Sequence, residues 1–506
     1  MNTEPSLLTP EPGELPDDDH TVLSALRSPK RLRIEILAGL AVALALIPEA
    51  ISFSILAGVD PRVGLYAAFT MAVTIAFVGG RRAMISGATG AIALVIAPVV
   101  AEYGIDYFIA TVLLAGVMQI VLSLVGVAKL MRFLPRSVMV GFVNALAILI
   151  FTAQFPELVG VPWLVYPLVI LGIAIMVLVP RMTKSIPAPL VVIVLLTIGA
   201  VVFGLDLPTV GDKGDLPSSL PSWFIPDVPF NIETLQIIAP FAFAMALVGL
   251  IESLMTAKLV DDITDSHSDK TRESWGQGVA NIVSGFFGGM GGCAMIGQTM
   301  INVKAGRART RISTFSAGVF LLILVVGLGP VVALIPMAAL VAVMIMVSVG
   351  TMDWHSVKPS TLRQMPFSAT AIMGTTVAVT IVTHNLAYGV ILGVVVATIF
   401  FAQRVSRFSH VVPVTMLDDD TCVYAVHGVL FFASSNDLVY QFDYANDPQN
   451  VIIDITDAQI YDSSTVAALD AIVLKYHQRG KNVEIIGIDE HSAKWHSLSG
   501  KLGAGH

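Results

Sequence analysis

Residues 86–93 read SGATGAIA, and residues 288–299 read GGMGGCAMIGQT. Each stretch is short, apolar and interrupted by glycines, and each is the third apolar segment in its half of the chain. A simple helix needs roughly 20 apolar residues to cross a bilayer, so neither stretch crosses alone. Such a matched pair is the best sequence indication of the substrate site in a transporter built from inverted repeats. The pair therefore predicts both an architecture and a site.

The flanking sequence predicts that architecture in more detail. Fourteen apolar segments begin near residues 34, 64, 86, 105, 136, 162, 187, 234, 275, 293, 312, 332, 366 and 386. A polar break at about 205–233 separates two stretches, about 34–204 and 234–404, which we interpret as repeats. Seven crossings in each repeat place the two repeats in opposite orientations, so we expect an α-helical membrane protein with a 7+7 inverted repeat.

Composition supports a membrane protein that crosses the bilayer many times. The 506 residues are 55% hydrophobic and 13% charged, with a mean hydropathy of +0.80, whereas soluble domains carry about 25% charged residues. A soluble enzyme is therefore excluded, and we find no motif for a nucleotide, a catalytic nucleophile, a cofactor or a metal. The net charge of -8 provides no basic field, so we expect no nucleic-acid partner. The two cysteines, Cys293 and Cys422, are predicted to be packing residues.

Loop charges predict the topology, because Lys and Arg accumulate in cytoplasmic loops. Of the 24 Lys and Arg residues before the C-terminal region, all but Arg62 and Lys213 fall on one side of the predicted membrane. We therefore expect a multi-pass protein of the cell (plasma) membrane with both termini in the cytoplasm. The first apolar run follows some 30 polar residues, and we expect no cleaved signal peptide.

The two ends of the chain differ from the membrane region, which we place at 31–405. Residues 1–30 are predicted to be a disordered tail, because they are too polar to bury a core. Residues 411–506 are of mixed composition and predict a small α/β domain. Its expected strands include 423–432, 451–455 and 483–488, its main helix is 463–478, and the order is strand, strand, helix, strand, helix, strand, helix.

The two glycine-rich segments predict an anion site. If both are half-helices that start at mid-membrane, their free N–H groups and partial positive charges face each other, which is an arrangement that binds anions. Thr89, Gln298 and Thr299 would add side-chain donors. The alternative is that the glycines only permit tight packing of helices in lipid.

Two acidic residues fall within membrane segments, where ionisable groups are costly and point to function. Glu49 follows Pro48 in the first segment, and Glu252 lies near the centre of the eighth, at the comparable position of the second repeat. Burial favours the neutral, protonated carboxyl, so either acid could carry a proton together with an anion. Alternatively, each is a satisfied structural group or reaches water at a helix end, and sodium coupling also stays open.

These residues resemble the sulfate permease (SulP) family, solute carrier family 26, over about residues 30–500. The matching motifs are Pro48-Glu49-Ala50-Ile51-Ser52-Phe53, Pro61-Arg62-Val63-Gly64-Leu65-Tyr66-Ala67-Ala68, Ser86-Gly87-Ala88-Thr89-Gly90, Glu252-Ser253, Gly278-Val279-Ala280-Asn281, and Gln298-Thr299-Met300-Ile301-Asn302-Val303-Lys304-Ala305-Gly306 with Thr310. The C-terminal region resembles the STAS domain of that family, including Asp462-Ser463-Ser464 at a helix start.

The resemblance implies a core domain that moves against a gate domain, in a homodimer that carries a small anion across the lipid bilayer. Family members carry sulfate, bicarbonate, chloride, oxalate or other carboxylates. Helices one, three, eight and ten of the core would enclose the anion. On matching positions the site would contain Phe53, Ala88, Thr89, Gly90, Glu252, Gly297, Gln298 and Thr299.

Two departures from the family pattern bear on the substrate. Many relatives have Gln where this chain has Glu49, and Ser-Arg-Thr where it has Gly297, Gln298 and Thr299. The missing Arg removes a fixed positive charge, which favours symport of a carboxylate or dicarboxylate with a proton. The alternatives are a sulfate or bicarbonate transporter, possibly coupled to sodium, an anion exchanger, a nucleobase permease of the same fold, a passive conductor, and a membrane sensor.

Ser464 is a candidate regulatory residue, because some STAS relatives are phosphorylated on the matching serine. The alternative is that this motif only starts a helix, with Asp462 or Ser463 as its cap.

Overall fold

A computed structural model describes residues 21–130, 134–182, 187–406, 409–418 and 420–488. The chain divides into two compact units, Met1–Gly393 and Val394–His506. Each unit is described here by itself.

The first unit is helical. Its long helices are α2 (Pro29–Ala57), α3 (Pro61–Val78), α4 (Gly90–Leu124), α6 (Arg136–Thr152), α7 (Val165–Met182), α8 (Ala188–Val202), α9 (Ile232–Thr264), α10 (Lys270–Phe286), α12 (Arg311–Ala333), α13 (Met337–Thr351), α15 (Phe367–Thr383) and α16 (Leu386–Ser406), which ends in the second unit. Its short elements are α1 (Val22–Arg27), α5 (Val127–Leu130), η3 (Phe155–Leu158), η4 (Val210–Lys213), α11 (Ile296–Met300), η5 (Ile301–Ala305) and α14 (Pro359–Gln364).

These helices fall at the fourteen apolar segments of the sequence, which confirms the 7+7 architecture. Among the described residues, eight helices are long and apolar enough to cross a membrane, and α8, α13 and α15 are shorter apolar helices. α4 contains most of the third segment and all of the fourth, and Gly104, with a φ of 85°, separates its two helical parts. The tenth segment is α11, which continues into η5, a turn of π-helix.

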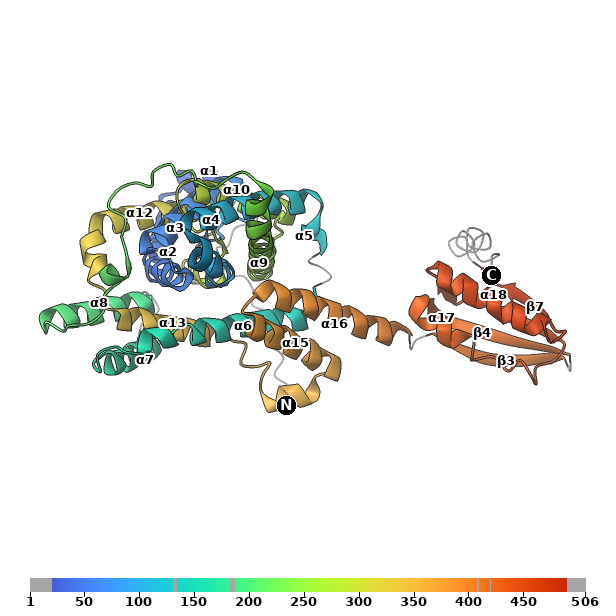
Figure 1. The fold of residues 1–506 in the computed structure, drawn as a ribbon. Helices are drawn as coiled ribbons and strands as arrows, with labels where there is room; N and C mark the ends of the chain where they lie inside the picture. The colour runs from blue at the N-terminus through green and yellow to red at the C-terminus, as the bar shows by residue number, and fades with distance from the viewer. Residues whose placement is uncertain (1–20, 131–133, 183–186, 407–408, 419, 489–506) are drawn as a thin grey trace, which may run out of the picture. The chain divides into compact units, whose positions relative to one another are not determined.

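Two bundles make up this unit (Figure 1). In the first, α4 packs on α9 and α10, and α12 packs on α2 and α3. Within this bundle, Glu35 of α2 is buried and holds the segment that leads into α12, since its Oε1 accepts the amides of Arg309 at 2.8 Å and Thr310 at 3.0 Å. In the second bundle, α6 packs on α13 and α15, and α13 packs on α7 and α8. We call these the core bundle and the gate bundle.

Two short strands sit inside the core bundle. The strand β1 (Ser86–Gly87) pairs antiparallel with β2 (Cys293–Ala294), so that Ser86 lies opposite Ala294 and Gly87 lies opposite Cys293. This approach needs a glycine, because a Cβ on Gly292 would lie 1.8 Å from the Gly87 carbonyl oxygen. Each strand leads into a helix, β1 into α4 and β2 into α11. The predicted half-helices of the two repeats therefore start side by side.

The second unit has the α/β composition expected of a STAS domain. Its elements are β3 (His410–Asp418), β4 (Thr421–Leu430), α17 (Phe432–Leu438), β5 (Asn450–Asp454), β6 (Ala458–Ile460), α18 (Ser463–His477) and β7 (Asn482–Ile486). The strand order is β3-β4-β5-β7, with β6 beside the end of β4. β3 and β4 are antiparallel, and the other pairs are parallel. The expected last helix falls on residues outside the described part.

Candidate functional site

The first turn of α4 is the centre of the candidate site. Thr89 caps the helix, and its Oγ1 accepts the amide of Ile92 at 3.4 Å. The amides that precede Ile92 have no partner within the helix, as at every helix N-terminus. Across the strand pair, Thr299 of α11 binds the segment before β1, because its Oγ1 accepts the amide of Ile85 at 3.0 Å. Both helix starts are thus fixed to each other, with donors and dipoles suited to an anion.

Glu252 reaches this point from the middle of α9. Its carboxyl is buried, and its Oε2 accepts a hydrogen bond from the thiol of Cys293 at 3.0 Å. The Oγ1 of Thr89 lies 3.2 Å from the same sulfur. The next residue, Ser253, accepts the amide of Ala294 through its Oγ at 3.0 Å. Three elements far apart in the sequence, α9, β2 and the cap of α4, therefore meet at one thiol.

Glu49 approaches the site from α2 and is partly buried. Its carboxyl hydrogen-bonds the side chain of Gln298, which is itself buried at the start of α11. Each acid thus lies beside one of the two half-helix starts. Within the described residues, no ion pair joins either acid to a basic side chain. The site therefore contains two carboxyl groups that lack a basic side chain to neutralise them.

An apolar wall and an open space complete the site. A Cβ on Gly90 would lie 2.9 Å from Phe53 Cε1 and 3.1 Å from Ile150 Cδ1, so residues from α2 and from α6 of the gate bundle close around this glycine. Gly297 differs, because it is exposed and a Cβ there would meet nothing within 4 Å. There is therefore free volume beside the first turn of α11.

Side chains of α10, two amides and one glutamate, support the strand pair through hydrogen bonds. Asn281 of α10 binds both sides of Gly292, accepting its amide at 2.8 Å and donating to its carbonyl at 3.1 Å. Gln277 donates to Ser86 Oγ of β1 and to Glu273 Oε1, both at 2.7 Å. These bonds extend the site by two turns along α10.

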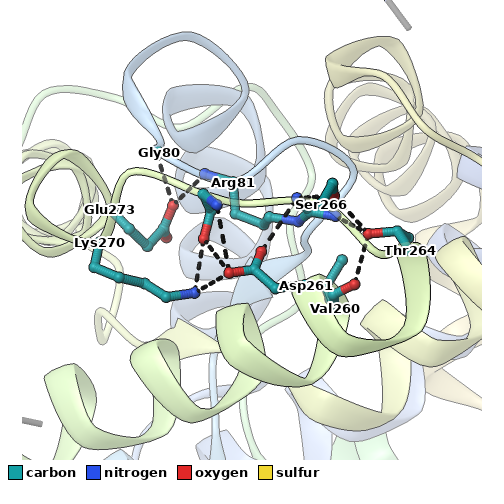
Figure 2. A network of polar contacts seen from close by, with 9 residues as sticks. Gly80, Arg81, Val260, Asp261, Thr264, Ser266, Lys270 and Glu273 are labelled. Atoms are coloured by element: carbon teal, nitrogen blue, oxygen red, sulfur yellow. Dashed lines mark hydrogen bonds and ion pairs between the residues drawn. The ribbon is translucent and has the colours of Figure 1, made fainter. Parts of the chain in front are cut away.

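The same chain of contacts ends at the loops that the sequence predicts to be cytoplasmic (Figure 2). Glu273 Oε2 accepts the amides of Gly80 at 2.8 Å and Arg81 at 2.9 Å. Asp261 of α9 pairs with Arg81 at 3.2 Å and with Lys270 at 2.5 Å. The loop after α3 and the loop after α9 are thereby joined. We call this end of the membrane unit the basic side.

A cavity of about 460 Å³ opens on the basic side between the two bundles. Leu254, Met255 and Lys258 line it from α9, starting two residues beyond Glu252, and Met139 lines it from α6. Lys129 and Lys258 are exposed and add positive charge. The cavity therefore opens beside the part of α9 that follows Glu252, with lysines in its lining.

The structure brings together most of the predicted site residues, from Glu49 and Phe53 through Ala88, Thr89 and Gly90 to Glu252 and 297–299. Ser464 belongs to the second unit, where it is exposed in the first turn of α18. The prediction that Cys293 only packs was wrong, because its thiol is a hydrogen-bond donor to Glu252. Among the described residues, no group of three or more His, Cys, Asp and Glu side chains could hold a metal.

Comparisons with known proteins agree with this geometry. The chain matches the sulfate permease family over residues 32–169 and 161–373, and the STAS domain over 413–501. It is 51% identical to a Bacillus subtilis protein named "Putative sulfate transporter YbaR", over 91% of this chain and 95% of that protein.

Solved structures show the same fold. The transmembrane domain of a cyanobacterial bicarbonate transporter, BicA, superimposes with a TM-score of 0.62 at 26% identity, over 73% of this chain and 98% of that chain. A structure of SLC26A9 superimposes with a TM-score of 0.78 at 17% identity, over 96% of this chain and 89% of that chain. With its two paired half-helices and its C-terminal STAS domain, the chain belongs to the sulfate permease family of anion transporters.

Proposed function

We propose that this protein is a secondary active transporter that carries a carboxylate or dicarboxylate together with a proton, by movement of the core bundle against the gate bundle. The observation that carries the proposal is the pair of carboxyl groups, Glu49 and Glu252, placed at an anion site without a basic partner among the described residues. A second negative charge in this pocket would be repelled unless an acid were protonated. Proton binding and anion binding would therefore favour each other.

Glu252 is the stronger candidate for the proton carrier, because it is more deeply buried and contacts the cap of α4 through Cys293. The anion would bind at the amides of the two half-helices, with Thr89 and Thr299 in reach and Phe53 closing the apolar side. Gly297 leaves room for a substrate with more than one carboxylate.

The test is uptake of labelled anions into proteoliposomes, with proton and sodium gradients imposed separately. The panel includes chloride, sulfate, bicarbonate and dicarboxylates. We expect uptake of a carboxylate that rises when the side of origin is acidified. Uptake that ignores the pH gradient contradicts proton coupling, and a response to sodium alone assigns the coupling to that ion.

A conservative substitution assigns the coupling to a residue. Glu252→Gln keeps the shape of the side chain and removes the titrating group, so we expect loss of pH-driven uptake with exchange of bound anion retained. Glu49→Gln restores the residue that many relatives have and should keep transport while weakening its pH dependence. Glu233→Gln is the control, since Glu233 lies exposed in the first turn of the same helix as Glu252. Equal pH responses in all three variants would contradict these roles.

Sulfate or bicarbonate is the second candidate substrate, favoured by the names of the relatives, a sulfate transporter and a bicarbonate transporter. The same panel separates the two, because saturable uptake and counterflow of sulfate or bicarbonate, without uptake of carboxylates, would assign that substrate instead.

The setting we propose is the plasma membrane, with both termini in the cytoplasm and two copies in a homodimer. The support is the one-sided distribution of basic loops and the likeness to the family. Labelling of single cysteines introduced at residues 62 and 272 from outside the cell tests the orientation, and we expect reaction at residue 62 only. Crosslinking in the membrane tests the dimer.

A further inference from the structure

A second cavity, separate from the transport site, lies on the basic side of the core bundle. It has a volume of about 370 Å³ and is lined by Gly80, Arg81, Arg82, Thr264, Ser266, His267, Asp269, Arg272, Arg309 and Arg311. Three loops contribute these residues, those after α3, after α9 and before α12. Ligand-binding pockets in proteins begin at about 300 Å³, so the cavity can hold a small molecule or a head group.

The lining of this cavity, which we call the arginine cavity, is strongly positive. Its lining holds five arginines against one acid, Asp269, which already caps α10 by accepting the amide of Arg272 at 2.8 Å. Three more acids lie close behind: Asp261 paired with Arg81, Glu273 bound to the loop amides, and Glu35 bound to the amide of Arg309. Even with these counted, positive charge remains in excess, because Lys270 also pairs with Asp261. Guanidinium groups held together in this way repel one another, and an anion would relieve that repulsion.

Two of the arginines are held in place by a helix end. Arg272 donates to the carbonyls of Val78 at 3.1 Å and Phe77 at 3.2 Å, and Arg311 donates to Ala76 at 3.0 Å and Gly79 at 2.5 Å. These carbonyls belong to the last turn of α3 and the residue after it, where acceptors lack helical partners. Such bonds engage only part of each guanidinium, which carries several N–H donors in a rigid fork. The remaining donors of Arg272 are therefore oriented before any ligand arrives.

We propose that the arginine cavity is a binding site for a phosphate group. Planar guanidinium forks match phosphate oxygens with paired hydrogen bonds, whereas the hydroxyls of Thr264 and Ser266 at the same wall are already bonded to Arg81 and to each other. The phosphate could belong to a free ion in the cytoplasm or to the head group of an anionic lipid, because juxtamembrane basic clusters attract such lipids. The proposal does not depend on the identity of the transported anion.

The test measures thermal unfolding of the purified full-length chain. For free phosphate, the chain is held in an uncharged detergent and titrated with potassium phosphate against potassium chloride at matched ionic strength. For a lipid source, it is placed in nanodiscs of phosphatidylcholine with or without phosphatidylglycerol. A ligand that binds only the folded chain raises the unfolding temperature. We expect a rise in at least one arm, and the arm that responds identifies the source.

Three variants locate the effect. Arg272→Gln and Arg82→Gln should each weaken binding at least tenfold, and the second serves if the first fails to fold. Arg62→Gln is the control, because Arg62 begins α3 at the opposite end from this cavity, beside Asp60 and Asp215. We expect it to bind as the unaltered chain does. Equal binding by all three variants, or no response in either arm, would overturn the proposal.

Discussion

At the scale of single residues, Cys293 shows what a sequence can and cannot reveal. A lone cysteine in an apolar segment is usually a small packing residue, and its partner Glu252 lies 41 positions away in the chain. The role of the glycines and threonines around it could be predicted, because such residues are common at helix N-termini whatever packs against them. The thiol contact was not, since it depends on how α9 packs against β2.

The role of Cys293 can be tested by two substitutions. Cys293→Ala removes the donor to Glu252 and leaves a buried carboxyl oxygen without it, at a cost of about 1–3 kcal/mol. We expect roughly tenfold slower proton-coupled uptake in proteoliposomes. Cys293→Ser keeps a donor of similar size and should retain most of the activity. If Ala and Ser behave alike, the hydrogen bond has no role in transport.

Substitution of two glycines of the site, Gly297 and Gly90, should have different effects on folding stability. At Gly297 there is open space, so Gly297→Ser should fold normally and alter substrate affinity. At Gly90 a methyl group would meet Phe53 and Ile150. Gly90→Ala should therefore lower the free energy of unfolding by about 1–3 kcal/mol through overpacking. We expect a lower unfolding temperature and loss of uptake. Thermal unfolding of the two purified variants checks this pair. Equal losses in both would show that the space at Gly297 is filled.

At the scale of elements, hydropathy located the helices because each crossing must satisfy its backbone within the lipid. The fourteen apolar segments correspond to helices of the structure, although the third and the tenth begin on the strands β1 and β2. The sequence did not predict the strand pair β1 and β2, the π-helical turn at 301–305, or the support of Ser86 by Gln277 of α10. Each of these depends on contacts between distant segments, which periodicity along one segment does not contain.

In the STAS domain, a tyrosine cluster should make stability depend on alkaline pH. Burial raises the pKa of Tyr424 and Tyr476, and hydrogen bonds to Asp447 at 2.7 Å and 2.5 Å raise it further. Burial also raises the pKa of Tyr444 to about 12. Because the pKa is higher in the folded domain than in the unfolded chain, the tyrosines contribute their full stability below the ordinary pKa near 10.0. That contribution to the free energy of unfolding is lost as the pH rises above it.

Tyr476→Phe tests this sign. It removes a titrating group and a bond to a charged partner, so the domain should be less stable at neutral pH, by about 1.5–3 kcal/mol, and should lose less stability above pH ~10. The full-length chain is unfolded in denaturant at neutral pH and above pH ~10, and the release of the domain by a protease is the readout. The two series give the stability at neutral pH and its alkaline loss. Tyr440→Phe is the control, because Tyr440 is 83% exposed. A steeper alkaline loss in Tyr476→Phe would contradict the assignment.

At the scale of the whole molecule, each unit contains a core of its own. The STAS domain packs Tyr424, Val451, Val466 and Tyr476 around its own sheet, and the described residues of the candidate site belong to the first unit. Composition predicts a membrane region at 31–405 and a soluble domain at 411–506, because a soluble core and a membrane bundle need different proportions of charged residues. The two compact units of the structure divide within α16 instead, between Gly393 and Val394.

Removal of residues 409–506 distinguishes a carrier from a sensor. Because Glu252, Cys293 and both half-helices remain, the shortened chain should keep measurable saturable uptake, at a reduced rate. Counterflow of labelled substrate in proteoliposomes is the measurement, and liposomes without protein set the background. Uptake at that background, from a shortened chain that still folds, would favour a sensing role.

The thiol between Glu252 and Thr89 also makes the protein a convenient object for spectroscopy. The sequence contains two cysteines, and Cys422 belongs to the core of the other unit. Cys422→Ser therefore leaves one thiol, located on the strand β2 that pairs with β1. A nitrile formed on that thiol would report the local electric field beside Glu252, in a chain whose transport is slowed by loss of the S–H donor.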